Sequence, residues 1–201
     1  MIKAIIFDFG GPIVEWESSA DVVFHKHEDH HNLERDSLRK LFNEYFVGGH
    51  VGDFHSISDF FDKTKPAINI TVEELNEVLN ETRAVMQIRP EMIAYINELK
   101  KKYKIALLSN FDNGIEKSLK EIFNIYHLFD LVISSYNVKM KKPDPEIYKY
   151  TLEKLDILPE ESVFIDDLEE NIKGAEAVGI RGIIFKNFEQ CKLDLENILH
   201  S

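Results

Sequence analysis

Cysteine is almost missing from this sequence, and so is any long apolar run. Cys191 is the one cysteine in 201 residues, so an intrachain disulfide and a thiolate metal cluster are both excluded. No apolar stretch approaches the ~20 residues that a membrane-spanning helix needs, and the apolar run before Asp8 is too short for a secretory signal. A reducing compartment requires no disulfides, so these absences together predict a cytoplasmic protein.

Positive charge is also scarce. The chain has 24 Lys and Arg residues against 36 Asp and Glu residues, which gives a formal net charge of −12. Binding to nucleic acid or to an anionic membrane depends on clustered positive charge, so neither partner is expected. The sequence holds no repeats and no Gly/Ser-rich linkers, and its length suits one domain, or one domain with a smaller insert. Nothing in the sequence determines the oligomeric state.

Five short apolar runs are predicted to be buried strands. Each is rich in Ile, Val, Leu or Phe, and its apolar character is nearly continuous rather than alternating. That pattern is typical of a parallel sheet whose two faces are both covered. The five runs are 4–7, 105–108, 131–134, 163–165 and 182–185.

Helical patterns separate these runs after residue 89. Pro90 stands near the first position of one helix, Asp144-Pro145 opens a second, and a third runs from about Glu169 toward Gly179, a glycine suited to a helix end. Strands that alternate with helices predict an α/β fold with a doubly wound parallel sheet.

The stretch 15–88 interrupts this alternation. It holds no convincing strand, whereas a capping-box pattern at Thr71 to Glu74 and an apolar pattern after Ser56 predict helices. The sequence therefore predicts an α/β core made of residues 1–14 and 89–201, with a helical insert at 15–88 after the first strand.

Polar residues follow the predicted strands at the points where the strands end. They are Asp8 after the first run, Ser109-Asn110 after the second, Asp166-Asp167 after the fourth, and Lys142 just before a predicted helix. In parallel sheets, ligands bind outside the carboxyl ends of the strands. Crowded carboxylates repel one another, and Mg²⁺ relieves that repulsion because it prefers carboxylate and water oxygens. A lysine and a serine hydroxyl beside the metal would hold a phosphate, so the set predicts phosphoryl transfer to a carboxylate.

These residues stand in four motifs that resemble, in order and spacing, those of the haloacid dehalogenase-like hydrolase superfamily. The motifs are "IIFDFGGPIV" with Asp8, "IALLSN" with Ser109, "KKPDPEIY" with Lys142, and "VFIDDLEENIKGAEAVG" with Asp166 and Asp167. The resemblance covers the whole predicted core and implies a Rossmann-like sheet. It also implies that the insert 15–88 is a helical cap of the family's first cap class, which closes over the site and selects the substrate. Asn171, Gly174 and Gly179 match what usually follows the acidic pair.

The resemblance further implies the nucleophile and the metal ligands. Asp8 is the expected nucleophile, which becomes an aspartyl ester, and it is also an expected Mg²⁺ ligand. Asp167 would bind the metal directly and Asp166 directly or through water, and the backbone carbonyl of Gly10 would complete the protein's share of the ligands.

A second group of residues is expected to hold the substrate. Ser109, Asn110 and Lys142 resemble the family's phosphate-binding set, and Lys142 would also steady the Asp8 carboxylate. Glu15 and Trp16 stand where the chain leaves the core and are expected at the pocket wall. For Ser109 an alternative stays open, because this serine could instead cap a helix that begins near Asp112.

Gly10 departs from the family pattern. Phosphatases of this family usually have an aspartate two residues after the nucleophile, as the acid that protonates the leaving group, and a glycine has no side chain for this role. General acid/base catalysis contributes about 10²–10⁴-fold, so the metal, the lysine and the nucleophile could leave a slower phosphatase. The resemblance then favours a sugar-phosphatase-like branch and a Mg²⁺-dependent phosphomonoesterase that acts on a small phosphorylated metabolite. Two alternatives remain: a haloacid dehalogenase-type hydrolase, and a non-catalytic protein that binds a phosphorylated ligand.

Two other clusters have simpler explanations. The run from His25 to His31 contains four histidines that invite a metal site, but a solvated, polar part of the cap is the preferred interpretation. Lys100-Lys101-Lys102 lies at the end of a predicted helix, where cations stabilise the helix dipole, so this run is interpreted as a solvated face.

Overall fold

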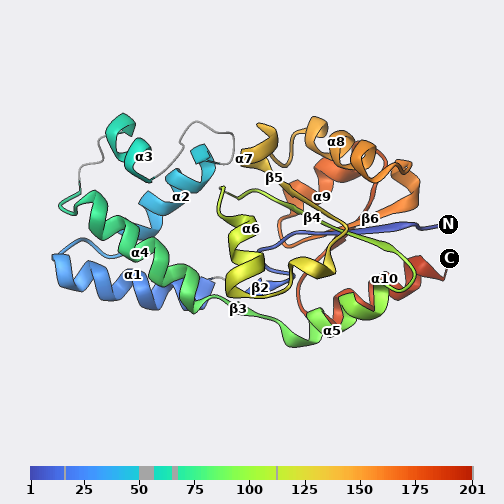
Figure 1. Ribbon diagram of the computed structural model, residues 1–201, viewed down its shortest axis with the longest axis horizontal. Coiled ribbons are helices and arrows are strands. Elements are labelled where there is room, and N and C mark those ends of the chain that lie inside the picture. Colours follow the sequence, from blue (N-terminus) through green and yellow to red (C-terminus); the bar gives the residue numbers. More distant parts are fainter. Residues whose placement is uncertain (16, 50–56, 65–67, 112, 201) are drawn as a thin grey trace.

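A five-stranded parallel sheet forms the centre of the protein (Figure 1). The computed structural model describes residues 1–15, 17–49, 57–64, 68–111 and 113–200. All four neighbouring strand pairs are parallel, and the order β5-β4-β1-β6-β7 places the first strand in the middle. This arrangement confirms the doubly wound α/β fold. The strands are β1 (Ala4–Phe7), β4 (Lys104–Ser109), β5 (Leu131–Ser134), β6 (Ser162–Asp166) and β7 (Arg181–Ile184).

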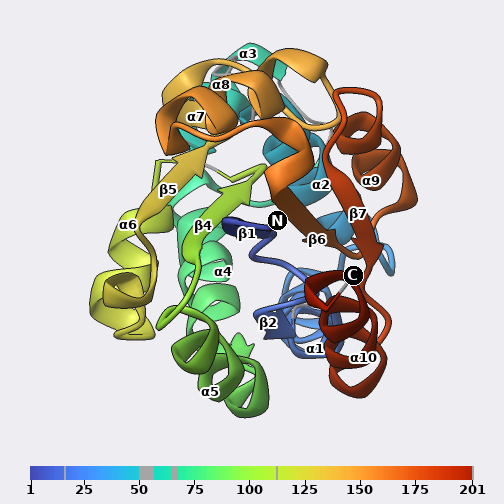
Figure 2. The ribbon, with the colours of Figure 1, turned by 90° about the vertical axis from the view of Figure 1, so that its right-hand side faces the viewer.

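Both faces of this sheet are buried, as the continuous apolar runs predict. Along β1, Ile5 and Phe7 point into one hydrophobic cluster, whereas Ala4 and Ile6 point into the other. Helices α5 (Pro90–Leu99) and α10 (Phe188–Leu199) cover the first face, and α8 (Pro145–Leu155) and α9 (Glu169–Glu176) cover the second (Figure 2).

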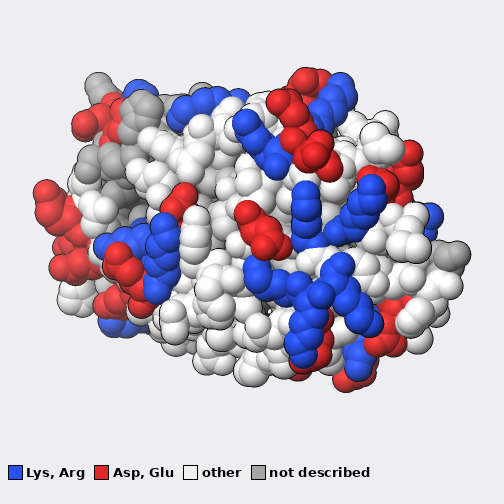
Figure 3. Space-filling view, turned by 45° about the vertical axis from the view of Figure 1, so that its right-hand side comes forward, with Lys and Arg blue, Asp and Glu red and all other residues white. Residues whose placement is uncertain are grey.

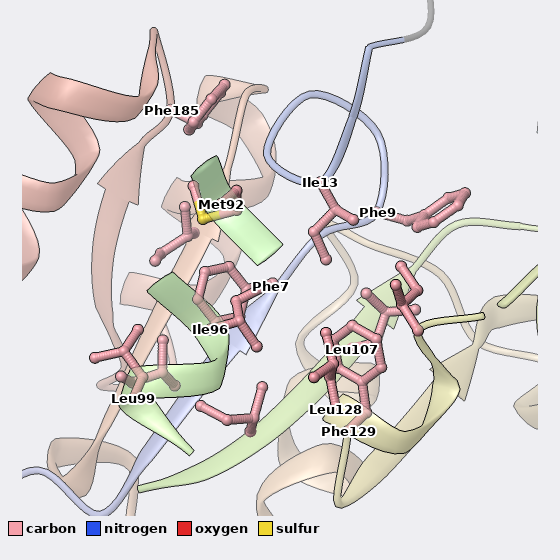
Figure 4. Close-up of a cluster of buried hydrophobic side chains, with 14 of the residues drawn as sticks. Phe7, Phe9, Ile13, Met92, Ile96, Leu99, Leu107, Leu128, Phe129 and Phe185 are labelled. Atoms are coloured by element: carbon pink, nitrogen blue, oxygen red, sulfur yellow. The ribbon is translucent and has the colours of Figure 1, made fainter. Parts of the chain in front are cut away.

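The first of these clusters is the larger, and Figure 4 shows how its side chains interlock between the sheet and its helices. Phe7 on the sheet faces Met92 and Ile96 of α5, and all three are fully buried. A fully buried side chain of this size contributes about 1.5–3 kcal/mol relative to an exposed one. This packing fixes the position of β1, and Asp8 directly follows this strand.

Shorter elements complete the core. They are α6 (Ile115–Lys117), a π-helical turn (Ser118–Ile122), two 3₁₀ turns (Tyr126–Leu128 and Pro159–Glu161) and α7 (Ser135–Val138). None of the helices in the described ranges combines the length and the apolar character needed to cross a membrane.

Four helices between β1 and α5 pack around a hydrophobic cluster of their own. Figure 1 shows them beyond the carboxyl ends of the central strands. Thr71 caps the fourth with the predicted capping box, in which its hydroxyl accepts a hydrogen bond from the Glu74 N–H and the Glu74 carboxylate accepts one from the Thr71 N–H. The helices are α1 (Glu17–His31), α2 (Ser37–Gly49), α3 (Ile57–Thr64) and α4 (Val72–Val85). Ser56, expected just before α3, lies outside the described residues.

The sequence did not indicate the short ribbon that begins and ends this helical segment. Strands β2 (Val14–Glu15) and β3 (Gln87–Ile88) pair antiparallel, with Val14 opposite Ile88. Two residues per strand are too few to show an alternating pattern. The ribbon brings the two connections between core and helices side by side, at the ends of the predicted insert 15–88.

Candidate active site at the carboxyl ends of the sheet

Asp8 follows the central strand and is almost completely buried. Its Oδ1 accepts a hydrogen bond from the N–H of Phe9 at 2.7 Å and lies 2.8 Å from the Lys142 ammonium nitrogen. Its Oδ2 accepts no hydrogen bond from any described residue. Burial raises the pKa of the Asp8 carboxyl, Lys142 lowers it and Asp166 raises it again, and the result is a pKa of about 7. The negative charge at this position is therefore only partly compensated by the protein.

Lys142 lies between two aspartates. Its Nζ is 2.8 Å from Asp8 Oδ1 and 2.6 Å from Asp166 Oδ2, and the side chain is 1% exposed. Burial alone would lower the pKa of this ammonium, but the two carboxylates raise it above its ordinary value. The lysine therefore stays charged and links the ends of β1 and β6.

The backbone of Lys142 is held in place by two neighbours. The side-chain amide of Asn110 donates to the Lys142 carbonyl and accepts from its N–H, both at 2.9 Å. On the other side, Gly174 of α9 approaches so closely that a Cβ at that position would lie 2.6 Å from the carbonyl oxygen of Pro143. Only a glycine allows α9 to pack this closely against the lysine loop.

Asp166 is fully buried and uses both carboxylate oxygens within the protein. Oδ1 accepts from the Leu168 N–H at 2.8 Å, Oδ2 accepts from Lys142, and the Asn171 amide nitrogen lies 3.0 Å from each oxygen. Tyr148 in turn donates its hydroxyl proton to the Asn171 carbonyl at 2.8 Å. Asp166 is thereby suited to orient Lys142, whereas the neighbouring Asp167 is exposed.

The three aspartates are close enough to share a cation. One carboxylate oxygen each of Asp8, Asp166 and Asp167 lies within 4.8 Å of the other two, the one group of three potential metal-ligating residues found in the described part of the chain. Three carboxylates against one lysine leave an excess of negative charge, which fits a hard divalent cation with oxygen ligands. Gly11 makes room for this cluster: its φ is +78°, and a Cβ would lie 2.6 Å from Asp167 Cγ.

Ser109 ends β4 beside β1, and its side chain is buried. Its hydroxyl makes no hydrogen bond to a described residue, and the N-cap of α6 is Gly114. The helix-capping alternative for Ser109 is therefore wrong for α6, and Asp112 lies outside the described residues. Asn110 meets the backbone of Lys142, so the structure gives its side chain a positioning contact; the role of both residues in phosphate binding stays a prediction.

Gly10 has open space where a side chain would lie. A Cβ built there meets no heavy atom within 4 Å, and its φ lies outside the left-handed region. The position of the missing acidic side chain is therefore empty and is not filled by side chains of the core. The role of its carbonyl as a metal ligand stays a prediction.

The sequence did not indicate that Arg89 is a neighbour of the site. Arg89, where the chain returns to the core, donates from Nε to the Gly11 carbonyl at 2.9 Å, and its own N–H donates to the Ile13 carbonyl. Its guanidinium also lies 3.6 Å from the exposed Glu15. Arg89 therefore ties down the loop after Asp8. No local pattern marks it, because its partners are more than 70 residues away. Trp16, the other expected wall residue, lies outside the described residues.

The histidine-rich run lies in α1 and packs partly against α4. His27 is buried, and its Nε2 lies 3.1 Å from the Glu81 carboxylate, while His31 lies 3.7 Å from Glu74. His30 is exposed. The expectation of a wholly solvated run is therefore wrong for His27, because this histidine lies on the face of α1 that meets α4.

A doubly wound parallel sheet that gathers three aspartates and a buried lysine at its carboxyl ends defines an α/β protein of the haloacid dehalogenase-like type. Comparison with known families agrees, because a family profile described as "haloacid dehalogenase-like hydrolase" matches residues 2–179. The chain belongs to this family of hydrolases.

Individual relatives include both phosphatases and dehalogenases. The chain is 26% identical to sesquiterpene phosphatase astK of Aspergillus oryzae, over 90% of this chain and 88% of that protein. It is 24% identical to (S)-2-haloacid dehalogenase 1 of Pseudomonas sp. strain CBS-3, over 90% and 83%. In some larger relatives, the segment that matches this chain is a minor part of the protein: 37% of one relative and 23% of another.

Solved structures share the fold. The haloacid dehalogenase family enzyme BT-2542 of Bacteroides thetaiotaomicron, crystallised with magnesium and inorganic phosphate, superposes with a TM-score of 0.69 at 24% identity, over 92% of this chain and 94% of that one.

Proposed function

We propose that this hydrolase is a Mg²⁺-dependent phosphomonoesterase that acts on a small phosphorylated metabolite through an aspartyl-phosphate intermediate. One observation carries the proposal: Lys142 lies between Asp8 and Asp166, with the exposed Asp167 at the same edge. The phosphatase relative and the enzyme crystallised with magnesium and phosphate support the same chemistry.

The proposed nucleophile is Asp8. Oδ1 is held by Phe9 and Lys142, which leaves Oδ2 to attack phosphorus while the bond from phosphorus to the ester oxygen breaks. Lys142 neutralises negative charge on the transferred group. Water then attacks the aspartyl phosphate, which releases inorganic phosphate and restores the carboxylate.

The proposed cation site consists of Asp8, Asp167 and the carbonyl of Gly10, with Asp166 further inside. Mg²⁺, when bound, supplies positive charge that offsets the phosphoryl oxygens. Asp167 is the exposed member of the acidic group, so it is the carboxylate best able to reach both a cation and solvent. Ser109, with its hydroxyl unused by described residues, is proposed to donate to a phosphate oxygen.

Leaving-group protonation is where this site is weakest. Gly10 offers no proton, so an alcohol must leave with help from solvent alone. Substrates that depart easily, such as acyl phosphates and anomeric sugar phosphates, should therefore react best. The helical segment, proposed to be a cap, lies beyond the carboxyl ends of the strands, where it could exclude water and select the substrate.

A phosphate-release assay tests the proposal. Acyl, sugar and nucleotide phosphates are incubated with the wild type and with Asp8→Asn, each with Mg²⁺ and with a chelator. We expect release only from the wild type with Mg²⁺. Asp156→Asn is the matched control, because Asp156 is exposed at the end of α8 with φ of +53°, a conformation that Asn tolerates. Activity that survives Asp8→Asn or chelation would exclude the mechanism.

A haloacid dehalogenase-type hydrolase is the second candidate. The relative from Pseudomonas supports it, and a halide leaves without a proton, so Gly10 would be no handicap. Against it stands the acidic cluster, because displacement of halide by Asp8 needs no cation. Halide release from 2-haloacids without metal would favour this candidate, and tight binding of a phosphorylated compound without turnover would favour a non-catalytic binding protein.

A further inference from the structure

The opposite end of the sheet carries a pocket rich in lysine. The pocket has a volume of about 730 Å³ and lies at the amino ends of β1, β4 and β5, near the ends of α5 and α8. That volume falls in the range typical of small-molecule sites. Figure 3 shows Lys and Arg side chains gathered on the face that includes the right-hand end of Figure 1. Its charged lining residues are Lys3, Lys100, Lys102, Lys104, Lys154 and Asp130.

This concentration of positive charge is unusual for a chain with a net charge of −12. Five lysines and one aspartate line the pocket, whereas the chain as a whole has an excess of acids. Lys100 pairs with Asp130 at 2.9 Å, and Lys3 pairs with Glu161 at 2.6 Å. The remaining three lysines form no ion pair with any described residue.

Stabilisation of helix ends explains only part of the pattern. Lys154 lies in the last turn of α8, where a cation suits the helix dipole, and Lys104 donates to the Leu155 carbonyl at 2.6 Å. Neither contact removes the positive charge. Lys102 lies beyond the end of α5 and is exposed, and its ammonium group makes no hydrogen bond or ion pair with a described residue. Three lysines without an ion-pair partner among the described residues around one hollow are more than helix capping requires.

The rest of the lining is apolar or aromatic. Ile2, Leu131 and Leu155 form part of the wall, and the half-buried ring of Tyr103 lies between Lys102 and Lys104 in the sequence. A lining that combines an aromatic residue with several lysines suits a ligand that has a flat group and several phosphates. A flat membrane or a nucleic acid strand would use a wider surface than this hollow.

We propose that this lysine pocket binds a small organic polyphosphate of nucleotide size, at a site separate from the candidate active site. The two sites lie at opposite ends of the same parallel strands, since Asp8 follows Phe7 at one end of β1 whereas Lys3 precedes Ala4 at the other. The proposal does not depend on the phosphatase activity.

Isothermal titration calorimetry with ATP and with inorganic triphosphate tests the proposal. The titration is done in EDTA, so that a site that requires Mg²⁺ does not contribute. The test variant is Lys102→Gln/Lys154→Gln, in which both residues are exposed, and the matched control is Lys40→Gln/Lys117→Gln, which removes the same charge from two exposed lysines outside the pocket. We expect the test variant to weaken ATP binding by about tenfold or more and the control by less than about twofold, because contacts to charged groups far exceed long-range screened attraction.

Two further measurements complete the experiment. Lys102→Arg/Lys154→Arg keeps both charges and should retain binding, which separates charge from a general loss of fold, and circular dichroism checks each variant. Triphosphate should bind more weakly than ATP if the flat group contributes. The proposal is overturned if ATP does not bind at millimolar concentration, if both glutamine pairs weaken binding equally, or if anionic vesicles or an oligonucleotide bind at this pocket more tightly than ATP.

Discussion

Replacing Gly10 by aspartate restores the carboxylate that this site lacks, and the structure has space for it. A Cβ at Gly10 meets no heavy atom within 4 Å, and its φ requires no glycine. Gly11, one residue later, is the opposite case, with φ of +78° and Asp167 within 3 Å of a built Cβ. Gly10→Asp should therefore fold like the wild type, and Gly11→Asp should not.

The expected gain follows from the chemistry of the leaving group. A general acid contributes about 10²–10⁴-fold, which corresponds to about 3–5 kcal/mol of transition-state stabilisation. This gain applies in full to poor leaving groups such as alkyl alcohols, which need a proton as they depart. A good leaving group such as 4-nitrophenolate should gain little, because it departs as an anion. For alkyl phosphates, kcat/KM should thus rise toward about 10²–10⁴-fold above the wild type, whereas for 4-nitrophenyl phosphate it should change little.

The assay is a leaving-group series. Kcat/KM is measured with Mg²⁺ for phosphate esters that range from 4-nitrophenyl to alkyl, for the wild type, Gly10→Asp and Gly10→Asn. Asparagine has the size of aspartate but cannot act as an acid, so it controls for packing. We expect a steep dependence on leaving-group pKa in the wild type and in Gly10→Asn, and a flatter one in Gly10→Asp.

Two results would refute this reasoning. If Gly10→Asp changed all esters by the same factor, the missing acid would not limit the wild type. If Gly10→Asn gave the same gain as Gly10→Asp, the effect would come from the shape of the loop and not from proton transfer.

Other predictions concern stability and reactivity. Lys142→Met leaves Asp8 and Asp166 without their shared cation, so without Mg²⁺ the free energy of unfolding in urea should fall by about 3–5 kcal/mol; an unchanged value would contradict the assigned pairing. Gly174→Ala puts a Cβ 2.6 Å from a backbone oxygen and should cost about 1–3 kcal/mol in the same assay, whereas Gly10→Ala should cost far less. Thr71→Ala removes the cap of α4 and should cost about 1 kcal/mol, read from thermal melts. Burial raises the pKa of the Cys191 thiol to about 12, so at pH 8 the folded protein should react with a thiol reagent far more slowly than the urea-unfolded chain; equal rates would show that this thiol is accessible.

Local patterns were enough to predict most of the core. The five strands lie where the apolar runs placed them, with ends that differ by at most one residue, because a buried parallel strand must be apolar on both faces. The cap at Thr71 is equally local, since its partner is three residues away. The ribbon of β2 and β3 was missed because its two strands are short and more than 70 residues apart.

The sequence by itself determined which chemical groups arrive at one edge of the sheet, because parallel strands end together and each motif directly follows or precedes an element. Only the tertiary structure decided which contacts each of these groups makes and how exposed it is. Lys142 lies between Asp8 and Asp166, Asp166 is enclosed by hydrogen bonds, and Asp167 stays exposed. The contacts of Lys142 with the two aspartates join residues 24 or more apart, and the close packing of α9 against the loop of Lys142 is equally non-local, so no local pattern encodes them. The lysine pocket likewise joins segments far apart in the chain, so the sequence showed only a run of charge at a helix end where the fold forms a hollow.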